Sequence, residues 1–176
     1  MGVTAGEGAR VAIAFGSNLG DREAAVREAL RRLADLGVRV EAVSTLYESA
    51  PAGFAGRGRG VPWFVNGACV GRTSLDPESL LAALQRLERE LGRTPEPGLA
   101  PRPIDLDLIL YDDRVVRRPG LTLPHPRFRE RAFVLWPLRE VAPDWRDPVT
   151  GRTVAELAQL LPDPGPALRP LRGREP

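Results

Sequence analysis

The chain has 176 residues and a formal net charge of +2, and each of its 25 basic residues is an arginine, set against 23 acidic residues. One domain is expected at this length, and 43% hydrophobic with 27% charged residues is the composition of an ordinary globular protein. No apolar run approaches the ~20 residues of a membrane-spanning helix, and no charged-then-apolar leader opens the chain, so neither a membrane protein nor a secreted protein is expected. The single cysteine, Cys69, excludes an intramolecular disulfide and lies in an apolar run, which predicts a buried thiol in a cytoplasmic protein.

The arginines are scattered along the chain, with local groups at 57–59, 114–118 and 127–131. A nucleic-acid-binding domain usually gathers its positive charge into one patch or stripe. Because acidic residues nearly balance the arginines here, the bias favours GC-rich coding over a general polyanion-binding role.

The first half of the chain predicts a strand, a helix and a second strand. An apolar strand at 11–15 ends in a turn from Gly16 to Gly20. Asp21 then caps a helix with apolar residues at helical spacing, which Gly37 ends. The alternating residues that follow predict a strand from Val38 that continues to Tyr47.

The next elements complete a β-α-β-β-α-β order. A strand at 64–70 is followed by a helix that starts at Asp76-Pro77 and ends at Gly92, and then by a strand at 104–110. This order predicts a ferredoxin-like α+β sandwich, with an antiparallel sheet and helices packed on its faces. We expect a short hairpin within 115–123, later helices at 133–141 and 153–161, a single domain over 9–161, and flexible termini at 1–8 and 162–176.

The strongest chemical signal is Asp105-Leu106-Asp107. Side chains two positions apart on a strand point to the same face, so both carboxylates project one way. Two acids on an apolar strand repel each other and lose hydration, which calls for a positive partner unless they face open solvent. Neighbouring arginines would serve, and so would a hard cation such as Mg²⁺.

Basic residues lie where they could complete a phosphate site. Arg93 and Arg102 bracket the loop before the two acids, Arg131 follows downstream, and arginine offers a planar fork of donors that suits phosphate. His125, the only histidine, stands between two prolines, which is a poor position for a core residue. No P-loop and no dinucleotide-binding glycine pattern is present, so these residues together predict phosphoryl chemistry at an unusual nucleotide site.

Several stretches, in this order, resemble the 6-hydroxymethyl-7,8-dihydropterin pyrophosphokinase family. The resemblance extends from about Val11 to Leu161. It implies a ferredoxin-like fold and transfer of the β,γ-pyrophosphoryl group of ATP to the hydroxymethyl group of a reduced pterin, with release of AMP, in folate biosynthesis. The matching stretches are AFGSNLGD (14–21), FVN (64–66), PRPIDLD (101–107), LPHP (123–126) and RAFVLWPL (131–138).

The resemblance also implies roles for individual residues. Asp105 and Asp107 would hold two Mg²⁺ ions that bridge the ATP phosphates, and with Arg93 and Arg102 they would form the catalytic set. Gln85 and Glu88 match positions that line the nucleotide site, although a solvated helix face would explain both equally well. The implied pterin site is Ser49, Ala52, Phe64, Asn66 and Phe133, with the two phenylalanines stacking on the ring and Asn66 contacting its amide edge; the implied ATP site is Gln85, Glu88, Arg93, Arg102, Leu108, Thr122, His125 and Arg131.

The chain departs from the family pattern at three places. Leu99 stands where the catalytic loop usually has tryptophan, Pro126 replaces the aromatic residue that commonly follows the histidine, and the loop from Pro51 to Pro62 is longer than usual. These departures bear on loop closure and ligand contacts more than on the reaction. We expect a cytoplasmic monomer that binds ATP and the pterin, with neither nucleic acid nor membrane as a partner.

Two other functions fit parts of the pattern. A ferredoxin-like RNA-binding module would present aromatic residues and positive charge on its central strands, whereas this strand presents Asp105 and Asp107. A Mg²⁺-dependent phosphohydrolase would share the two carboxylates without needing Phe64, Asn66 and Phe133.

Overall fold

The computed structural model describes residues 7–51, 62–93 and 102–171. Its main feature is a six-stranded antiparallel sheet with the strand order β5-β1-β4-β3-β8, in which β2 also pairs with β4. This is the predicted ferredoxin-like arrangement, extended by edge strands. The sheet consists of β1 (Ala9–Ser17), β2 (Val38–Val43), β3 (Tyr47–Ser49), β4 (Phe64–Thr73), β5 (Asp105–Tyr111) and β8 (Leu168–Pro170), and a separate hairpin consists of β6 (Val116–Arg118) and β7 (Leu121–Leu123).

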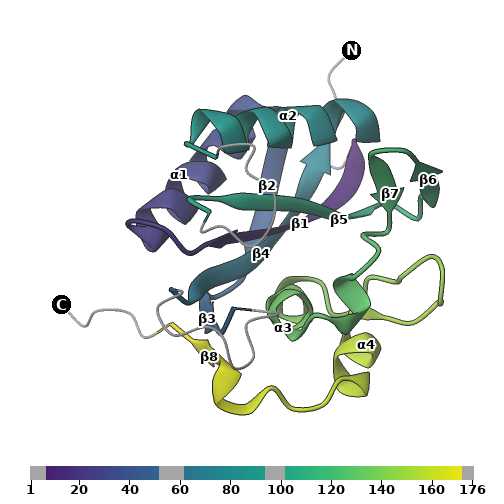
Figure 1. Ribbon diagram of the computed structural model, residues 1–176. Helices are drawn as coiled ribbons and strands as arrows, with labels where there is room; N and C mark the ends of the chain where they lie inside the picture. Colours follow the sequence, from purple (N-terminus) through teal and green to yellow (C-terminus); the bar gives the residue numbers. More distant parts are fainter. Residues whose placement is uncertain (1–6, 52–61, 94–101, 172–176) are drawn as a thin grey trace.

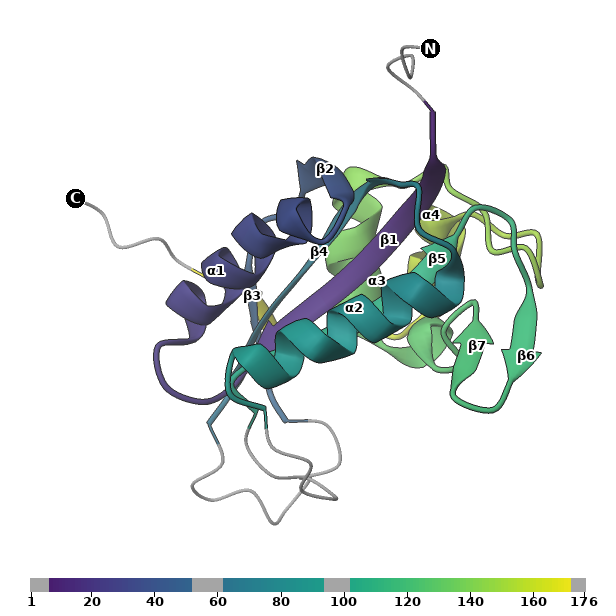
Figure 2. The ribbon, with the colours of Figure 1, turned by 90° about the horizontal axis from the view of Figure 1, so that it is seen from above.

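Helices cover both faces of the sheet, as Figures 1 and 2 show. The helices α1 (Arg22–Asp35) and α2 (Pro77–Glu90) pack on one face, against Ile13 and Phe15 of β1. The helices α3 (Ala132–Val141) and α4 (Val154–Leu160) pack on the other, against Ala12 and Ala14. Because side chains alternate along a strand, β1 contributes large residues to the first core and small ones to the second. Two short 3-10 turns complete the chain, η1 (Phe128–Glu130) and η2 (Gly165–Ala167).

The predicted helix starts are confirmed by their caps. The Asp21 carboxylate accepts a hydrogen bond from Ala24 N at 3.1 Å, and Asp76 accepts one from Ser79 N at 2.8 Å. Thr153 and Glu156 form a capping box at the start of α4. In each case a short polar side chain satisfies a backbone donor that the first helical turn leaves unpaired.

Two expectations differ from the structure. The strand expected to run from Val38 to Tyr47 is divided into β2 and β3, which pair with successive parts of β4. Glu140, near the end of α3, accepts hydrogen bonds from Thr45 N at 2.9 Å and from the Tyr47 hydroxyl, and so holds the intervening bend. The flexible tail expected over 162–176 contains β8, because backbone pairing with β3 orders a segment whose composition alone suggested fraying.

Some predictions fall outside the described residues. Ala52, Leu99 and most of the long loop between Pro51 and Pro62 are among them, so the structure does not place them. Cys69 is described and is fully buried, as predicted, and burial raises the pKa of its thiol to about 12. None of the helices in the described part of the chain is long and apolar enough to span a lipid bilayer.

Candidate active site

The floor of the candidate site is the middle of β1, where two small residues leave open space above the sheet. Ala14 lies opposite Asp107 of β5, and Gly16 lies between Asp105 of β5 and Asn66 of β4. A Cβ atom at Gly16 would lie 2.6 Å from Asn66 Oδ1, so only glycine fits beside this amide. Small side chains on the central strand therefore form a hollow with carboxylates on one side and a polar amide on the other.

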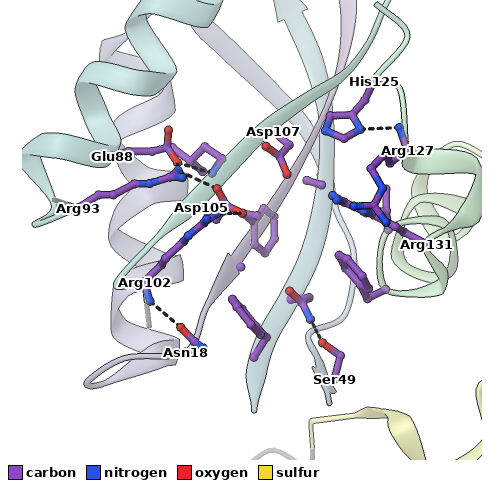
Figure 3. A pocket seen from close by; sticks show the side chains of 18 of the residues that line it. Asn18, Ser49, Glu88, Arg93, Arg102, Asp105, Asp107, His125, Arg127 and Arg131 are labelled. Carbon is purple, nitrogen blue, oxygen red and sulfur yellow. Dashed lines mark hydrogen bonds and ion pairs between the residues drawn. The ribbon is translucent and has the colours of Figure 1, made fainter. Parts of the chain in front are cut away.

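Asp105 and Asp107 project from β5 into this hollow, on the face expected from their spacing (Figure 3). Among the described residues, Asp107 makes no hydrogen bond and no ion pair, although it is largely withdrawn from water. Burial, reinforced by repulsion from Asp105, raises the pKa of Asp107 to about 6, with Arg131 acting in the opposite direction. A divalent cation at this position would compensate both the lost hydration and the repulsion.

The residues present fit Mg²⁺. Two carboxylates on one strand face are oxygen ligands of the kind that Mg²⁺ prefers, and this ion usually keeps positions for water and phosphate oxygens. The described residues contain no cluster of three or more His, Cys, Asp or Glu side chains that could enclose a metal. Asp105 and Asp107 would thus hold the ion together with a phosphorylated substrate rather than in an all-protein cage.

A buried acid and an arginine lie at the free edge of β5. The Glu88 carboxylate of α2 accepts a hydrogen bond from Leu106 N at 3.2 Å and forms an ion pair with Arg93. Arg93 Nη1 also lies 2.8 Å from Asp105 Oδ1. Burial raises the pKa of Glu88 to about 7 despite the opposing charge of Arg93. Glu88 is therefore buried, and the interpretation of its sequence position as part of a solvated helix face is excluded.

Asn18 holds the backbone of Arg102 beside the acids. Its side-chain Oδ1 accepts a hydrogen bond from Arg102 N at 2.6 Å, and its backbone N donates to the Arg102 carbonyl at 3.1 Å. Arg102 Nη1 then lies 3.5 Å from Asp105 Oδ2. The turn after β1 thus sets the position of an arginine that is 84 residues away in the chain.

The other side of the hollow presents aromatic rings and an amide. Asn66 Nδ2 donates a hydrogen bond to Ser49 Oγ of β3, which fixes the orientation of the amide. Phe64 at the start of β4 and Phe133 in the first turn of α3 line the same cavity. Arg131, the residue before α3, lies with its guanidinium carbon 5.5 Å from the centre of the Phe133 ring. This arrangement suits a flat heterocycle with a polar edge.

His125 is held in one tautomer. Its backbone N donates to the Ile109 carbonyl of β5 at 2.9 Å, and its Nδ1 accepts a hydrogen bond from Arg127 N at 3.2 Å. The ring hydrogen therefore lies on Nε2. Burial, together with repulsion from Arg131, lowers the pKa of His125 to about 4, so the ring is a neutral hydrogen-bond donor at physiological pH.

The predicted site residues come together in two adjoining cavities. The larger has a volume of about 1110 Å³, and the smaller, of about 310 Å³, shares His125 and Asp107 with it. Leu108 and Thr122 line the smaller cavity, and Ala52 is not described. The larger cavity is lined by the remaining predicted residues, Ser49, Phe64, Asn66, Gln85, Glu88, Arg93, Arg102, Asp105, Asp107, His125, Arg131 and Phe133.

Sequence reasoning missed four polar residues of the larger cavity, Asn18, Arg89, Arg127 and Glu130. Arg89 follows Gln85 by one helical turn, so the spacing of α2 could have placed it on the same side. Local patterns place Asn18 in a turn, and nothing local in the sequence indicates that its amide holds another loop. For Arg127, the sequence indicates a place in the site only by its position two residues after His125.

Comparison with known proteins identifies the family. The model of the family described as 7,8-dihydro-6-hydroxymethylpterin-pyrophosphokinase (HPPK) matches residues 12–143. The chain belongs to the HPPK family. The matched segment includes most of β1, both acids of β5, His125 and the start of α3, and with them every described residue that lines the larger cavity.

The chain is similar both to proteins of about its own length and to much longer proteins. A 2-amino-4-hydroxy-6-hydroxymethyldihydropteridine pyrophosphokinase of Pseudomonas aeruginosa is 41% identical over 157 residues, which cover 89% of this chain and 94% of that protein. The folic acid synthesis protein fol1 of Pneumocystis carinii is 40% identical over 153 residues, 87% of this chain. The chain spans 20% of the length of that longer protein.

Solved structures agree on the fold. The HPPK-DHPS protein of Plasmodium falciparum superimposes with a TM-score of 0.66 at 15% sequence identity, over 87% of this chain and 44% of that one. Membership of the HPPK family supports neither the RNA-binding module nor the phosphohydrolase that parts of the sequence had left open.

Proposed function

We infer that the protein transfers the pyrophosphoryl group of ATP to the hydroxymethyl group of 6-hydroxymethyl-7,8-dihydropterin and releases AMP, as a step in folate biosynthesis. The observation that carries this inference is the arrangement across Ala14 and Gly16. Two carboxylates of β5 face an aromatic and amide pair of β4 on the same side of the sheet. A phosphate–metal site and a heterocycle site therefore adjoin, as a transfer between ATP and a pterin requires.

In this reaction the hydroxymethyl oxygen loses its proton to solvent and forms a bond to the β-phosphorus, and the bond from that phosphorus to the oxygen bridging the α- and β-phosphates breaks, so that AMP leaves. We propose that Asp105 and Asp107 hold Mg²⁺ with the ATP. When bound, the metal neutralises phosphate charge and aligns the reacting groups. We propose that two Mg²⁺ ions bind and that ATP is a substrate.

The chain's own residues would position the two substrates. Arg93, Arg102 and Arg131 would donate to phosphate oxygens, and His125 would donate through its Nε2 hydrogen. Because His125 is neutral, it would orient the phosphate without adding charge. Leu108 and Thr122 of the smaller cavity, with Gln85 and Glu88, would line the nucleotide.

The pterin would lie between Phe64 and Phe133, with its amide edge at Asn66 and with Ser49 and Ala52 beside it. Ring stacking and a paired donor and acceptor complement a flat, polar-edged heterocycle. We also propose that the protein is cytoplasmic, which its buried free cysteine supports, and that it is a monomer.

The test is AMP release from ATP in the presence of Mg²⁺, with and without 6-hydroxymethyl-7,8-dihydropterin. AMP should form in equal amount to the pterin diphosphate, and omission of either Mg²⁺ or the pterin should abolish it. If AMP forms as fast without the pterin as with it, the proposed function is wrong and a phosphohydrolase activity takes its place.

A further inference from the structure

The C-terminal strand β8 pairs with the outer edge of β3, the strand that carries Ser49. In this pairing Arg169 lies opposite Glu48, and Leu168 lies opposite Ser49. Two further backbone bonds extend the contact, from Ala50 N to the Ala167 carbonyl at 2.9 Å and from Leu171 N to the Leu46 carbonyl at 2.8 Å. The strand lies outside residues 12–143, the segment that the family model matches, so family membership does not account for its role.

Four side chains connect β8 to the surrounding elements, and we call Arg22, Glu48, Trp63 and Arg169 the C-terminal clamp. Arg169 Nη2 and Nε lie 3.0 and 3.2 Å from Glu48 Oε2, and its guanidinium carbon lies 4.8 Å from the centre of the Trp63 ring. Arg22, at the start of α1, donates to Glu48 Oε1 at 3.0 Å and to the Trp63 carbonyl at 2.7 Å. Burial alone would raise the pKa of Glu48, but hydrogen bonds from Arg169 and Arg22 hold this pKa below its ordinary value.

The clamp is adjacent in the chain to the proposed pterin site. Glu48 precedes Ser49, whose hydroxyl accepts the bond from Asn66, and Trp63 precedes Phe64. Because successive side chains on a strand point to opposite faces, Glu48 projects away from the cavity that Ser49 lines. The clamp can therefore act on a ligand only through the backbone of β3 and β4.

The clamp also joins the two chain segments that flank the loop between β3 and β4. Glu48 and the backbone of Ala50 fix the segment before it, and Trp63 fixes the segment after it. Without Arg169, Glu48 would keep only Arg22, and the stacking on Trp63 would be lost. Ser49 and Phe64 are the last pair of the β3–β4 ladder, next to this loop, so loss of these contacts would leave that end of the ladder less tightly held.

We propose that the C-terminal clamp, with Arg169 as its central positioning residue, fixes Ser49 and Phe64 for pterin binding. This inference rests on the proposed function, since it assigns the clamp to the pterin half of that site. Asp105, Asp107 and His125 are held by β5 and its neighbours, and no residue of the clamp contacts them among the described residues. Loss of the clamp should therefore weaken pterin binding and leave the phosphate half of the site intact.

The experiment compares wild type with Arg169→Ala, using AMP release at varied pterin and varied ATP, and direct pterin binding by calorimetry. We expect Arg169→Ala to raise the KM and the Kd for pterin about 3- to 10-fold, from the loss of one ion pair and one cation–π contact. The kcat at saturating pterin and the KM for ATP should stay within about 2-fold of wild type, since the lost contacts are weak surface contacts outside the phosphate half of the site.

Two further variants separate positioning from general loosening. Arg169→Lys keeps the charge near Glu48 but loses the planar fork, and should restore part of the pterin affinity. Arg152→Ala removes an exposed arginine outside the clamp and should behave as wild type. An unchanged pterin Kd in Arg169→Ala would overturn the proposal, and so would an equal rise in the KM of both substrates.

The same experiment distinguishes failure of the clamp from failure of the proposed function. If wild type binds pterin and Arg169→Ala binds it equally well, only the clamp is wrong. If wild type neither binds pterin nor releases AMP with it, the proposed function is wrong and the clamp loses its assigned role as well.

Discussion

Arg93 Nη1 lies 2.8 Å from Asp105 Oδ1, so an arginine already neutralises a carboxylate that we assign to Mg²⁺. The same guanidinium pairs with the buried Glu88, whose pKa burial raises to about 7. We therefore expect Arg93 to exchange Asp105 for a phosphate oxygen when metal and ATP bind, while Glu88 keeps the guanidinium in place. This relationship connects the end of α2 to the start of β5.

Replacement of Arg93 tests this role. We expect Arg93→Ala to lower kcat about 100-fold, the usual loss when one preorganised donor to a developing charge is removed. Arg93→Lys should recover only part of the rate. A lysine keeps the positive charge but lacks the planar fork that serves two carboxylates. Arg86→Ala is the matched control, since Arg86 lies on α2, seven residues before Arg93, with its side chain 61% exposed. Steady-state AMP release within 2-fold of wild type would contradict the assignment.

Asp107→Asn should abolish Mg²⁺-dependent turnover without unfolding the protein. The amide is the same size as the carboxylate but is a poor Mg²⁺ ligand, and we expect a loss of at least ~100-fold in kcat. The variant should melt at or above the wild-type temperature, because it removes a charge that burial disfavours. Asp113→Asn, on the exposed turn after β5, is the control. Turnover comparable to wild type would show that Asp107 holds no metal.

Phe133→Ala should weaken pterin binding by ~1–3 kcal/mol through loss of stacking and buried area. Phe133→Leu should lose less, because it retains the apolar surface without the ring. Calorimetric titration with pterin measures the effect, and titration with a nonhydrolysable ATP analogue in the same preparation shows whether the nucleotide half is preserved. An unchanged pterin affinity would place the pterin elsewhere.

Asp147 should make stability depend on pH in the acid range. Its side chain is fully buried, and although burial acts in the opposite direction, hydrogen bonds from Arg129 and Thr150 lower the pKa of Asp147 to about 2. A carboxyl with a lower pKa in the folded than in the unfolded state stabilises the fold above the unfolded value, near 4. That stabilisation is lost as the pH falls from about 4 to about 2.

Asp147→Asn should therefore lower the free energy of unfolding by about 2 kcal/mol at pH 7, with little difference from wild type near pH 2. Denaturant unfolding at several pH values measures this difference. Asp144→Asn, on the exposed turn three residues earlier, should follow the wild-type curve. A constant difference between wild type and Asp147→Asn at all pH values would show that the Arg129 bond does not perturb the titration of Asp147.

Local patterns in the sequence were sufficient for the order of the central strands and helices up to β5, the helix caps and the shared face of Asp105 and Asp107. Each of these depends on residues within a few positions of one another, as with Asp21 and Ala24 or Asp76 and Ser79. The period of apolar residues separates helices from strands, and a short polar residue before a helix satisfies its first free donors. Family resemblance added the residues that line the two cavities.

Tertiary structure alone decided the rest, because the contacts concerned join residues far apart in the chain. Glu140 divides a predicted strand from 95 residues away, Asn18 holds Arg102, and β8 pairs with β3 across 121 residues. The net charge of +2 and the scattered arginines said little about function by themselves. Their meaning depends on which arginine faces which carboxylate, and only packing of the sheet and helices brings those side chains within hydrogen-bond distance.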